Sequence, residues 1–137
     1  MKICSACLLG IKCRYDGRAK RNNRVISLSK KETLIPVCPE QLGGLTTPRE
    51  QAEQRGKKVF TKSGTDISKS FVDGAKQVLL IAKLYGIKEA ILKQRSPSCG
   101  CGYVYDGSFT GKIIKGSGVT TTLLKKNGIR VVTEEDL

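Results

Sequence analysis

A long amphipathic segment followed directly by a short apolar one indicates the fold class of this sequence. In DISKSFVDGAKQVLLIAKLYG, residues 66–86, apolar side chains recur at helical spacing, at Phe71, Ala75, Val78, Leu79 and Ala82. Asp66 or Ser68 can cap the start of this helix, and Gly86 can end it. The run KEAILK, residues 88–93, then has the pattern of a buried strand. A helix that leads straight into a buried strand favours an α/β fold.

Other segments continue this alternation. Short strands are expected in MKICS at the start of the chain, in TLIPVCPE at 33–40, at 57–61 as an edge strand, and in IRVVT at 129–133. A second helix is expected around the apolar residues Val119, Leu123 and Leu124. The alternation predicts a small α/β domain with a mostly parallel, Rossmann-like sheet flanked by helices. Because no repeat or linker interrupts it, residues 1–137 are expected to form a single domain.

Cysteine-containing loops follow three of the predicted strands. Cys7 comes after the first strand and Cys38 after the second, and Cys99 lies in the loop QRSPSCGCGYVYDG that follows residues 88–93. In open α/β sheets, ligands bind outside the carboxyl ends of the strands. We therefore expect Cys7, Cys38 and Cys99 to converge at one edge of the sheet. The glycines and prolines of these loops can shape the backbone around a bulky group.

The six cysteines favour metal binding or chemistry over a disulfide scaffold, because 137 residues can build a hydrophobic core without one. Their spacings, C-x2-C, C-x5-C, a lone cysteine and C-x-C, do not match a structural zinc pattern. The chain has no histidine, which excludes imidazole catalysis and histidine-bound zinc. Thiolates alone suit an iron–sulfur cluster or an all-sulfur zinc site. Cys4, within a strand, is expected to be a small buried apolar residue.

The charge balance is strongly basic, with 25 Lys and Arg against 12 Asp and Glu. A net charge of +13 attracts anions, and either nucleic acid or general surface charge can account for it. The densest basic patch, residues 18–24, has no interleaved aromatic residues, so no nucleic-acid-binding motif supports the first reading. No apolar run approaches the roughly 20 residues of a membrane span, and the N-terminus lacks a secretory signal. A cytoplasmic location is therefore expected.

Three polar side chains near these cysteines are candidates for chemistry. Glu40, two residues after Cys38, can activate water or simply begin a helix. Ser96 and Ser98 can orient a substrate or satisfy the backbone of a turn. A glycine-rich stretch at 116–124 is similar to a phosphate cradle, but it lacks the spacing of a nucleotide-binding motif.

The stretches SACLLGIKCRYDG, PVCPEQLGGLTTPRE, ILKQRSPSCG, YDGSFTGK and GVTTTLLKKNGI together resemble the 2-thiouracil desulfidase family, formerly a domain family of unknown function. The resemblance covers nearly the whole chain in the same order. It implies a compact α/β enzyme that carries a [4Fe–4S] cluster held by only three cysteines. The fourth iron is then open to bind the sulfur of the substrate.

Carried over by position, the resemblance assigns the cluster ligands to Cys7, Cys38 and Cys99. Cys13 also matches a family cysteine and is the alternative ligand. The family more often has other residues at two further positions, Cys4 and Cys101. These two thiols are either bystanders or an additional thiol near the cluster.

The resemblance also implies a reaction and its residues. Glu40 would deprotonate a water molecule that attacks the thiocarbonyl carbon, and Ser96 would hold the heterocycle or a proton in place. Ser98 is expected to contact the substrate. The resemblance implies a small thiolated nucleobase as the substrate, and the oxo base and hydrogen sulfide as the products, with no net redox change. The basic surface favours an anionic or nucleotide-like ligand.

Two other classes of function compete with this one. The first is a nucleic-acid-associated module with structural zinc, in which four or more thiolates would surround the ion and leave no open position. The second is a persulfide sulfur carrier or sulfurtransferase, which needs one reactive thiol with a low pKa and no cluster. The cysteine spacing argues against zinc, and three separate cysteine loops argue against a single-thiol carrier.

Overall fold

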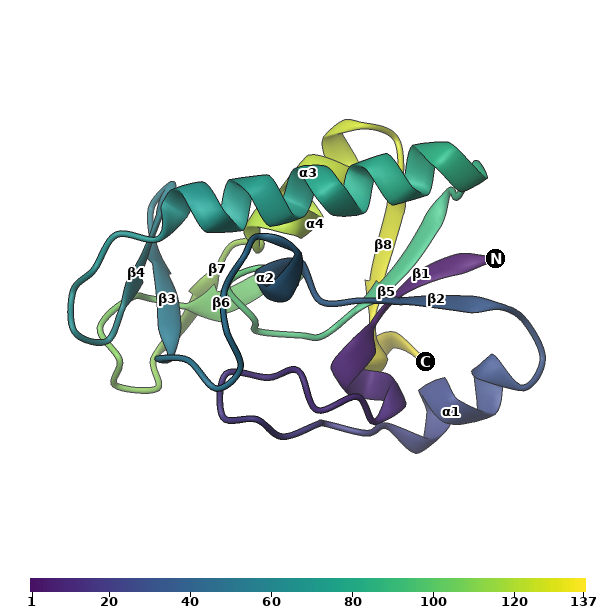
Figure 1. Ribbon diagram of the computed structural model, residues 1–137, viewed down its shortest axis with the longest axis horizontal. Coiled ribbons are helices and arrows are strands. Elements are labelled where there is room, and N and C mark those ends of the chain that lie inside the picture. The colour runs from purple at the N-terminus through teal and green to yellow at the C-terminus, as the bar shows by residue number, and fades with distance from the viewer.

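A four-stranded parallel sheet forms the centre of the computed structural model, which describes all 137 residues (Figure 1). Its order is β2-β1-β5-β8, with bounds Leu34–Val37, Lys2–Ser5, Glu89–Leu92 and Arg130–Thr133. Every adjacent pair in this sheet is parallel. The prediction of a small α/β domain with a mostly parallel sheet is therefore confirmed.

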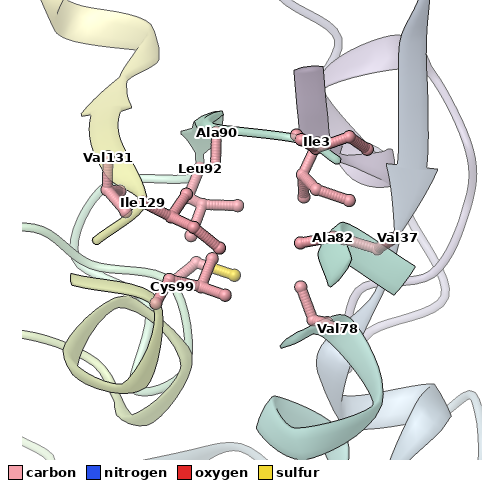
Figure 2. Packing of buried hydrophobic residues seen from close by; sticks show 11 residues of the cluster. Ile3, Val37, Val78, Ala82, Ala90, Leu92, Cys99, Ile129 and Val131 are labelled. Atoms are coloured by element: carbon pink, nitrogen blue, oxygen red, sulfur yellow. The ribbon is translucent and has the colours of Figure 1, made fainter. Parts of the chain in front are cut away.

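Helices cover both faces of the sheet, because alternate residues of each strand point to opposite sides. One face carries α3 (Ser68–Tyr85) and α4 (Val119–Lys126), and Figure 2 shows Val78 and Ala82 of α3 packed near Ile3 of β1. The other face carries α1 (Asn23–Ser29) and the short 3₁₀ helix η1 (Ala6–Leu9), where Cys4 of β1 is buried. None of the helices combines the length and the apolar character needed to cross a membrane.

The long helix α3 begins and ends close to the predicted residues. Gly86 ends it in the left-handed conformation, at φ +63°, as expected. The start differs, because Ile67 occupies the cap position and has no capping side chain. Asp66 lies one residue earlier, and its carboxylate accepts the backbone N–H of Ser68 at 2.9 Å.

Two β-hairpins lie beyond the sheet. The first joins β3 (Ala52–Arg55) to β4 (Lys58–Thr61), and the second joins β6 (Tyr103–Tyr105) to β7 (Ile113–Lys115). The edge strand expected at 57–61 is β4, which pairs only with β3, in a sheet separate from the main one. In Figure 1 both hairpins lie on the side toward which β1 and β5 run.

The order of the strands determines where a ligand site can form. From β1 the chain crosses to β2 on one side, and after β2 it returns to β5 on the other side of β1. The connections therefore diverge between β1 and β5. In open α/β sheets a crevice forms outside the carboxyl ends of the strands at such a switch point.

Candidate functional site

A cavity of about 360 Å³ lies at this carboxyl edge of the sheet. Its wall is built from segments that follow β1, β2 and β5, together with residues of the first hairpin. The lining includes side chains that can bind a metal, transfer a proton or form hydrogen bonds: Cys7, Cys13, Cys38, Glu40, Arg49, Lys93, Ser96 and Cys99. Cys7, Cys38 and Cys99, which were expected to converge at one edge of the sheet, thus line a single cavity.

Each of the three predicted thiols lies in the segment that follows the carboxyl end of a strand. Cys7 lies in η1, directly after β1. Cys38 occupies the cap position of α2 (Pro39–Leu42), where Pro39 begins the helix with its fixed φ. Cys99 lies in the turn that follows β5, and Figure 2 shows its side chain beside the apolar core near Leu92 and Ile129. The structure therefore brings together thiols that are far apart in the sequence.

Cys13 joins this group as a fourth thiol. Its side chain is in contact with the thiols of Cys7 and Cys38. The Sγ of Cys38 also donates a weak hydrogen bond to the backbone oxygen of Cys13, at 3.7 Å. All six cysteines of the chain are free thiols. The cavity thus offers four sulfur donors, and Cys13 contacts two of the others, Cys7 and Cys38.

The crowding of these thiols disfavours their charged forms. The contact with Cys38 lowers the pKa of Cys13, but the contact with Cys7 and burial outweigh it and raise this pKa to about 11. The contact with Cys13 and burial raise the pKa of Cys38 above the usual range of a thiol. Burial raises the pKa of Cys99 to about 12. Thiolates gathered here need a positive partner, which a bound metal group supplies.

The chemistry of the donors limits the kinds of metal group they can hold. All four are thiols, and no three Cys, Asp or Glu side chains are arranged around a position for one metal ion. In a four-iron cluster each cysteine binds a different iron, so the ligands need not surround a single point. The cavity thiols therefore fit a cluster better than a closed zinc site.

Glu40 is the only carboxylate that lines the cavity. It lies in the first turn of α2, so its position follows from that of Cys38. Its Oε1 accepts a hydrogen bond from Nε of Arg49 at 3.1 Å. No side chain or backbone group of the protein donates to Oε2. One carboxylate oxygen is therefore held, and the other is left to act on a ligand.

Arg49 is the site residue that sequence reasoning missed. Its side chain is only 8% exposed. Beyond Glu40, it donates hydrogen bonds to the backbone oxygen of Thr46, the hydroxyl of Thr47 and the backbone oxygen of Cys13. Nothing in the stretch TTPRE marks this arginine as buried, because its partners lie on three segments that only the fold brings together.

Ser96 stabilises a turn through its hydroxyl oxygen, and its hydroxyl hydrogen can still be donated in a hydrogen bond. Its Oγ accepts the backbone N–H groups of Ser98 and Cys99, at 3.1 and 3.0 Å. These bonds fix the turn that carries Cys99. A hydroxyl has two acceptor positions and one donor hydrogen, so the hydrogen of Ser96 is free to point at a ligand in the cavity.

The structure does not bring Ser98 to the cavity. Its side chain is 1% exposed and its hydroxyl pairs with that of Thr120 at 2.7 Å. Its backbone oxygen accepts the N–H of Thr120 at the start of α4. Neighbouring carbonyls of the same loop, at Pro97 and Gly100, accept the N–H groups of Val119 and Gly118. The amide groups of the glycine-rich stretch therefore bind this loop, not a phosphate.

Cys4 and Cys101 do not line the cavity. Cys4 is fully buried in β1, where burial raises the pKa of its thiol to about 12. Cys101 packs against the core on the α3 face, with its Sγ directed at the backbone oxygen of Val131. The expectation that Cys4 is a buried apolar residue agrees with this placement.

Basic side chains dominate the electrostatics of the cavity. Five cations line it, and Glu40 is the one anion. Several cations have carboxylate partners, as in the pair of Lys93 with Glu134 and the pair of Arg95 with Glu135. Lys20 has none, and it lies on the exposed loop that precedes α1. The cavity therefore favours ligands that are anionic or carry electron-rich atoms.

Comparisons with known proteins agree with this arrangement. The model of a family described as 2-thiouracil desulfurase matches residues 3–136. YbbK of Bacillus subtilis (strain 168), an uncharacterized protein, is 42% identical over 147 residues, which span 100% of this chain and 97% of that protein. The solved structure of the [4Fe-4S]-dependent thiouracil desulfidase TudS is similar, with a TM-score of 0.94 and 44% identity. The match covers 99% of this chain and 91% of that one.

Proposed function

The chain belongs to the 2-thiouracil desulfurase family, and from this we propose that it removes sulfur from a small thiolated pyrimidine such as 2-thiouracil. The reaction is a hydrolysis that gives the oxo base and hydrogen sulfide. One observation carries the proposal: four free thiols and a single carboxylate line one cavity at the switch point of the sheet. Similarity to TudS over nearly the whole chain supports it.

The donor set fits an iron–sulfur cluster, because it consists of thiols alone and their raised pKa values call for a cationic partner. We assign a [4Fe–4S] cluster to Cys7, Cys38 and Cys99, which come from three different strand ends, with Cys13 as the alternative ligand. When bound, such a cluster supplies an iron without a protein ligand, a soft Lewis acid suited to a thiocarbonyl sulfur.

Glu40 is assigned the role of general base. It is the only carboxylate in the cavity, and its Oε2 has no hydrogen-bond donor from the protein. That oxygen can accept a proton from a water molecule placed beside the substrate carbon. The pairing of Oε1 with Arg49 limits rotation of the carboxylate and keeps Oε2 turned away from the arginine.

Ser96 is assigned the role of a substrate donor. Its two acceptor positions are occupied by the N–H groups of Ser98 and Cys99, which fixes the oxygen in space. Its hydrogen can then bond to a ring oxygen or nitrogen of the pyrimidine. This contact would orient the ring so that the thiocarbonyl carbon faces the water held by Glu40.

The reaction balances without an electron donor. One carbon–sulfur double bond breaks, and the oxygen of one water molecule forms the new carbonyl group. The two protons of that water leave with the sulfur as hydrogen sulfide, the first by way of Glu40. No atom of the protein is consumed and no group changes its oxidation state.

The partner that follows from this is a small thiolated base. The predominance of cations around the cavity supports a ligand with anionic groups attached, while no motif supports nucleic acid itself. Six free thiols and an oxygen-sensitive cofactor support a reducing compartment, so we propose that the protein acts in the cytoplasm.

The proposal is tested by incubating the anaerobically reconstituted protein with 2-thiouracil and measuring uracil and sulfide together. We expect the two products in equal amounts, and a large loss of rate in Glu40→Gln. Glu89→Gln is the matched control, because Glu89 pairs with Lys2 at the opposite end of the sheet. A protein with full iron content that releases neither product would contradict the proposed function.

A further inference from the structure

Arg49 holds an unusual position for a cation. Its side chain is almost buried, and four of its five N–H groups have protein acceptors. Burying a guanidinium group is costly unless its hydrogen bonds are satisfied. Here they are satisfied by a carboxylate, a hydroxyl and two backbone oxygens, so the side chain is fixed in one orientation.

The acceptors of Arg49 belong to two walls of the cavity. Glu40 lies on α2, directly after the thiol of Cys38. The backbone oxygen of Cys13 lies on the loop that follows η1, 2.9 Å from the guanidinium. The backbone N–H of Arg49 also donates to the backbone oxygen of Tyr15, at 2.8 Å. Arg49 therefore connects the carboxylate to the loop on which a cavity thiol is carried.

We propose that Arg49 is a positioning residue for Glu40, so that the free carboxylate oxygen faces the attacking water molecule; this inference rests on the proposed function. The guanidinium binds Oε1 through Nε while its other nitrogens are anchored to Thr46, Thr47 and Cys13. An anchored donor of this kind sets both the position and the rotation of the carboxylate. A general base works only when the accepting oxygen is within hydrogen-bond reach of the proton.

A lysine at this position would keep the charge but lose the anchor. Its ammonium is a single flexible donor centre that cannot make the same fork of bonds. Arg49→Lys therefore separates positioning from charge. The contrasting pair is Arg130 with Glu89, which lies at the other end of the sheet, is 3.7 Å apart and has an arginine that is 74% exposed. Arg130→Lys is the matched control.

The test is a double-mutant cycle on the reconstituted protein with 2-thiouracil as substrate. We expect Arg49→Lys to lower kcat by about 10- to 100-fold, as small displacements of a reacting group do, with little change in KM. In the Glu40→Gln background the same change should have no further effect on kcat. Guanidinium ions added at low concentration should restore part of the rate of Arg49→Ala. Arg130→Lys should behave as the wild type.

Two readouts other than activity show whether the cluster site stays intact and whether Arg49 and Glu40 interact. The iron content and visible spectrum of Arg49→Lys should equal those of the wild type, because the cavity thiols remain in place. The unfolding midpoints of the cluster-free single and double variants should be non-additive, which reports the contact of Arg49 with Glu40.

Four results would overturn the inference: an unchanged kcat in Arg49→Lys, an equal loss of kcat in the Glu40→Gln background, a loss of iron that accounts for the lower rate, or additive unfolding midpoints. A wild-type protein with full iron content and no activity would contradict the proposed function as well. An active wild type with an unaffected Arg49→Lys would contradict this inference alone.

Discussion

The position of α2, which carries Glu40 and follows Cys38, depends on a close approach to α3 at two glycines. A Cβ atom added to Gly74 would lie 1.9 Å from the backbone oxygen of Pro39, and one added to Gly43 would lie 2.0 Å from that of Ser70. Both obstacles are backbone atoms, so no side chain can rotate away. We therefore predict that Gly74→Ala forces the two helices apart.

The size of the effect follows from these distances. An ordinary Cβ contact begins near 3.4 Å, so α2 would have to move by about 1.5 Å. Alanine stabilises a helix by about 1 kcal/mol relative to glycine, while overpacking costs about 1–3 kcal/mol or more. With backbone atoms on both sides, we expect a net loss of about 1–2 kcal/mol in the free energy of unfolding. A shift of this size also lowers kcat by about 100-fold.

Denaturant unfolding of the cluster-free protein measures the first effect, and sulfide release by the reconstituted protein measures the second. Gln77→Ala is the control, because it changes an exposed residue of the same helix with little change in helix propensity. A Gly74→Ala protein that is as stable and as active as the wild type would refute the view that this close approach positions α2.

Three further predictions concern residues outside the cavity. Ser98→Ala should lower the free energy of unfolding by about 1–3 kcal/mol, since it leaves the hydroxyl of Thr120 unpaired, and should leave KM unchanged; a raised KM would instead place Ser98 at the substrate. The raised pKa of Cys4 contributes stability to the cluster-free protein, fully present below pH 9 and lost between pH 9 and about 12. From about pH 8 to about pH 10.5, the free energy of unfolding in urea should therefore decline less steeply in Cys4→Ala than in the wild type. Parallel declines would contradict this. Cys101→Ala should keep its full iron content, and a loss of iron would show that this thiol reaches the cluster.

The elements that the sequence predicts well are those whose signal is local. The helix at Ser68–Tyr85 has an apolar stripe and a terminal glycine, and the strand that follows it, Glu89–Leu92, is apolar at its last three residues. The convergence of the cysteine loops could also be predicted, because it depends only on the direction of the strands and not on detailed packing.

The elements that escaped prediction lack such local signals. The strand Ala52–Arg55 is polar, and it becomes a strand through its pairing with Lys58–Thr61. The helix Asn23–Ser29 is short and buries only Val25, although Asn22 caps it with hydrogen bonds to two backbone N–H groups. That cap lies within the basic patch at 18–24, where the charged residues on both sides of Asn22 do not form the apolar pattern of a helix start.

The contacts of the site were the least predictable part. Arg49 contacts Glu40 and Cys13 only because the fold brings helix α2 and two loops together, and no spacing rule links those positions. Ser96 and Ser98 are two residues apart in similar surroundings, yet one lines the cavity and the other is buried against Thr120. The turn that separates them is set by hydrogen bonds to the Ser96 oxygen, which the sequence does not specify by itself.

The thiols at the carboxyl edge of the sheet are assigned a [4Fe–4S] cluster, held by three of their number. The most direct measurement is the iron content and visible absorption of anaerobically reconstituted protein, compared with alanine variants of the cavity thiols, Cys7, Cys13, Cys38 and Cys99. We predict a brown wild type with about four irons per chain, retained in Cys13→Ala and lost in the other three. A colourless protein that binds one zinc ion, or no metal, would contradict the account.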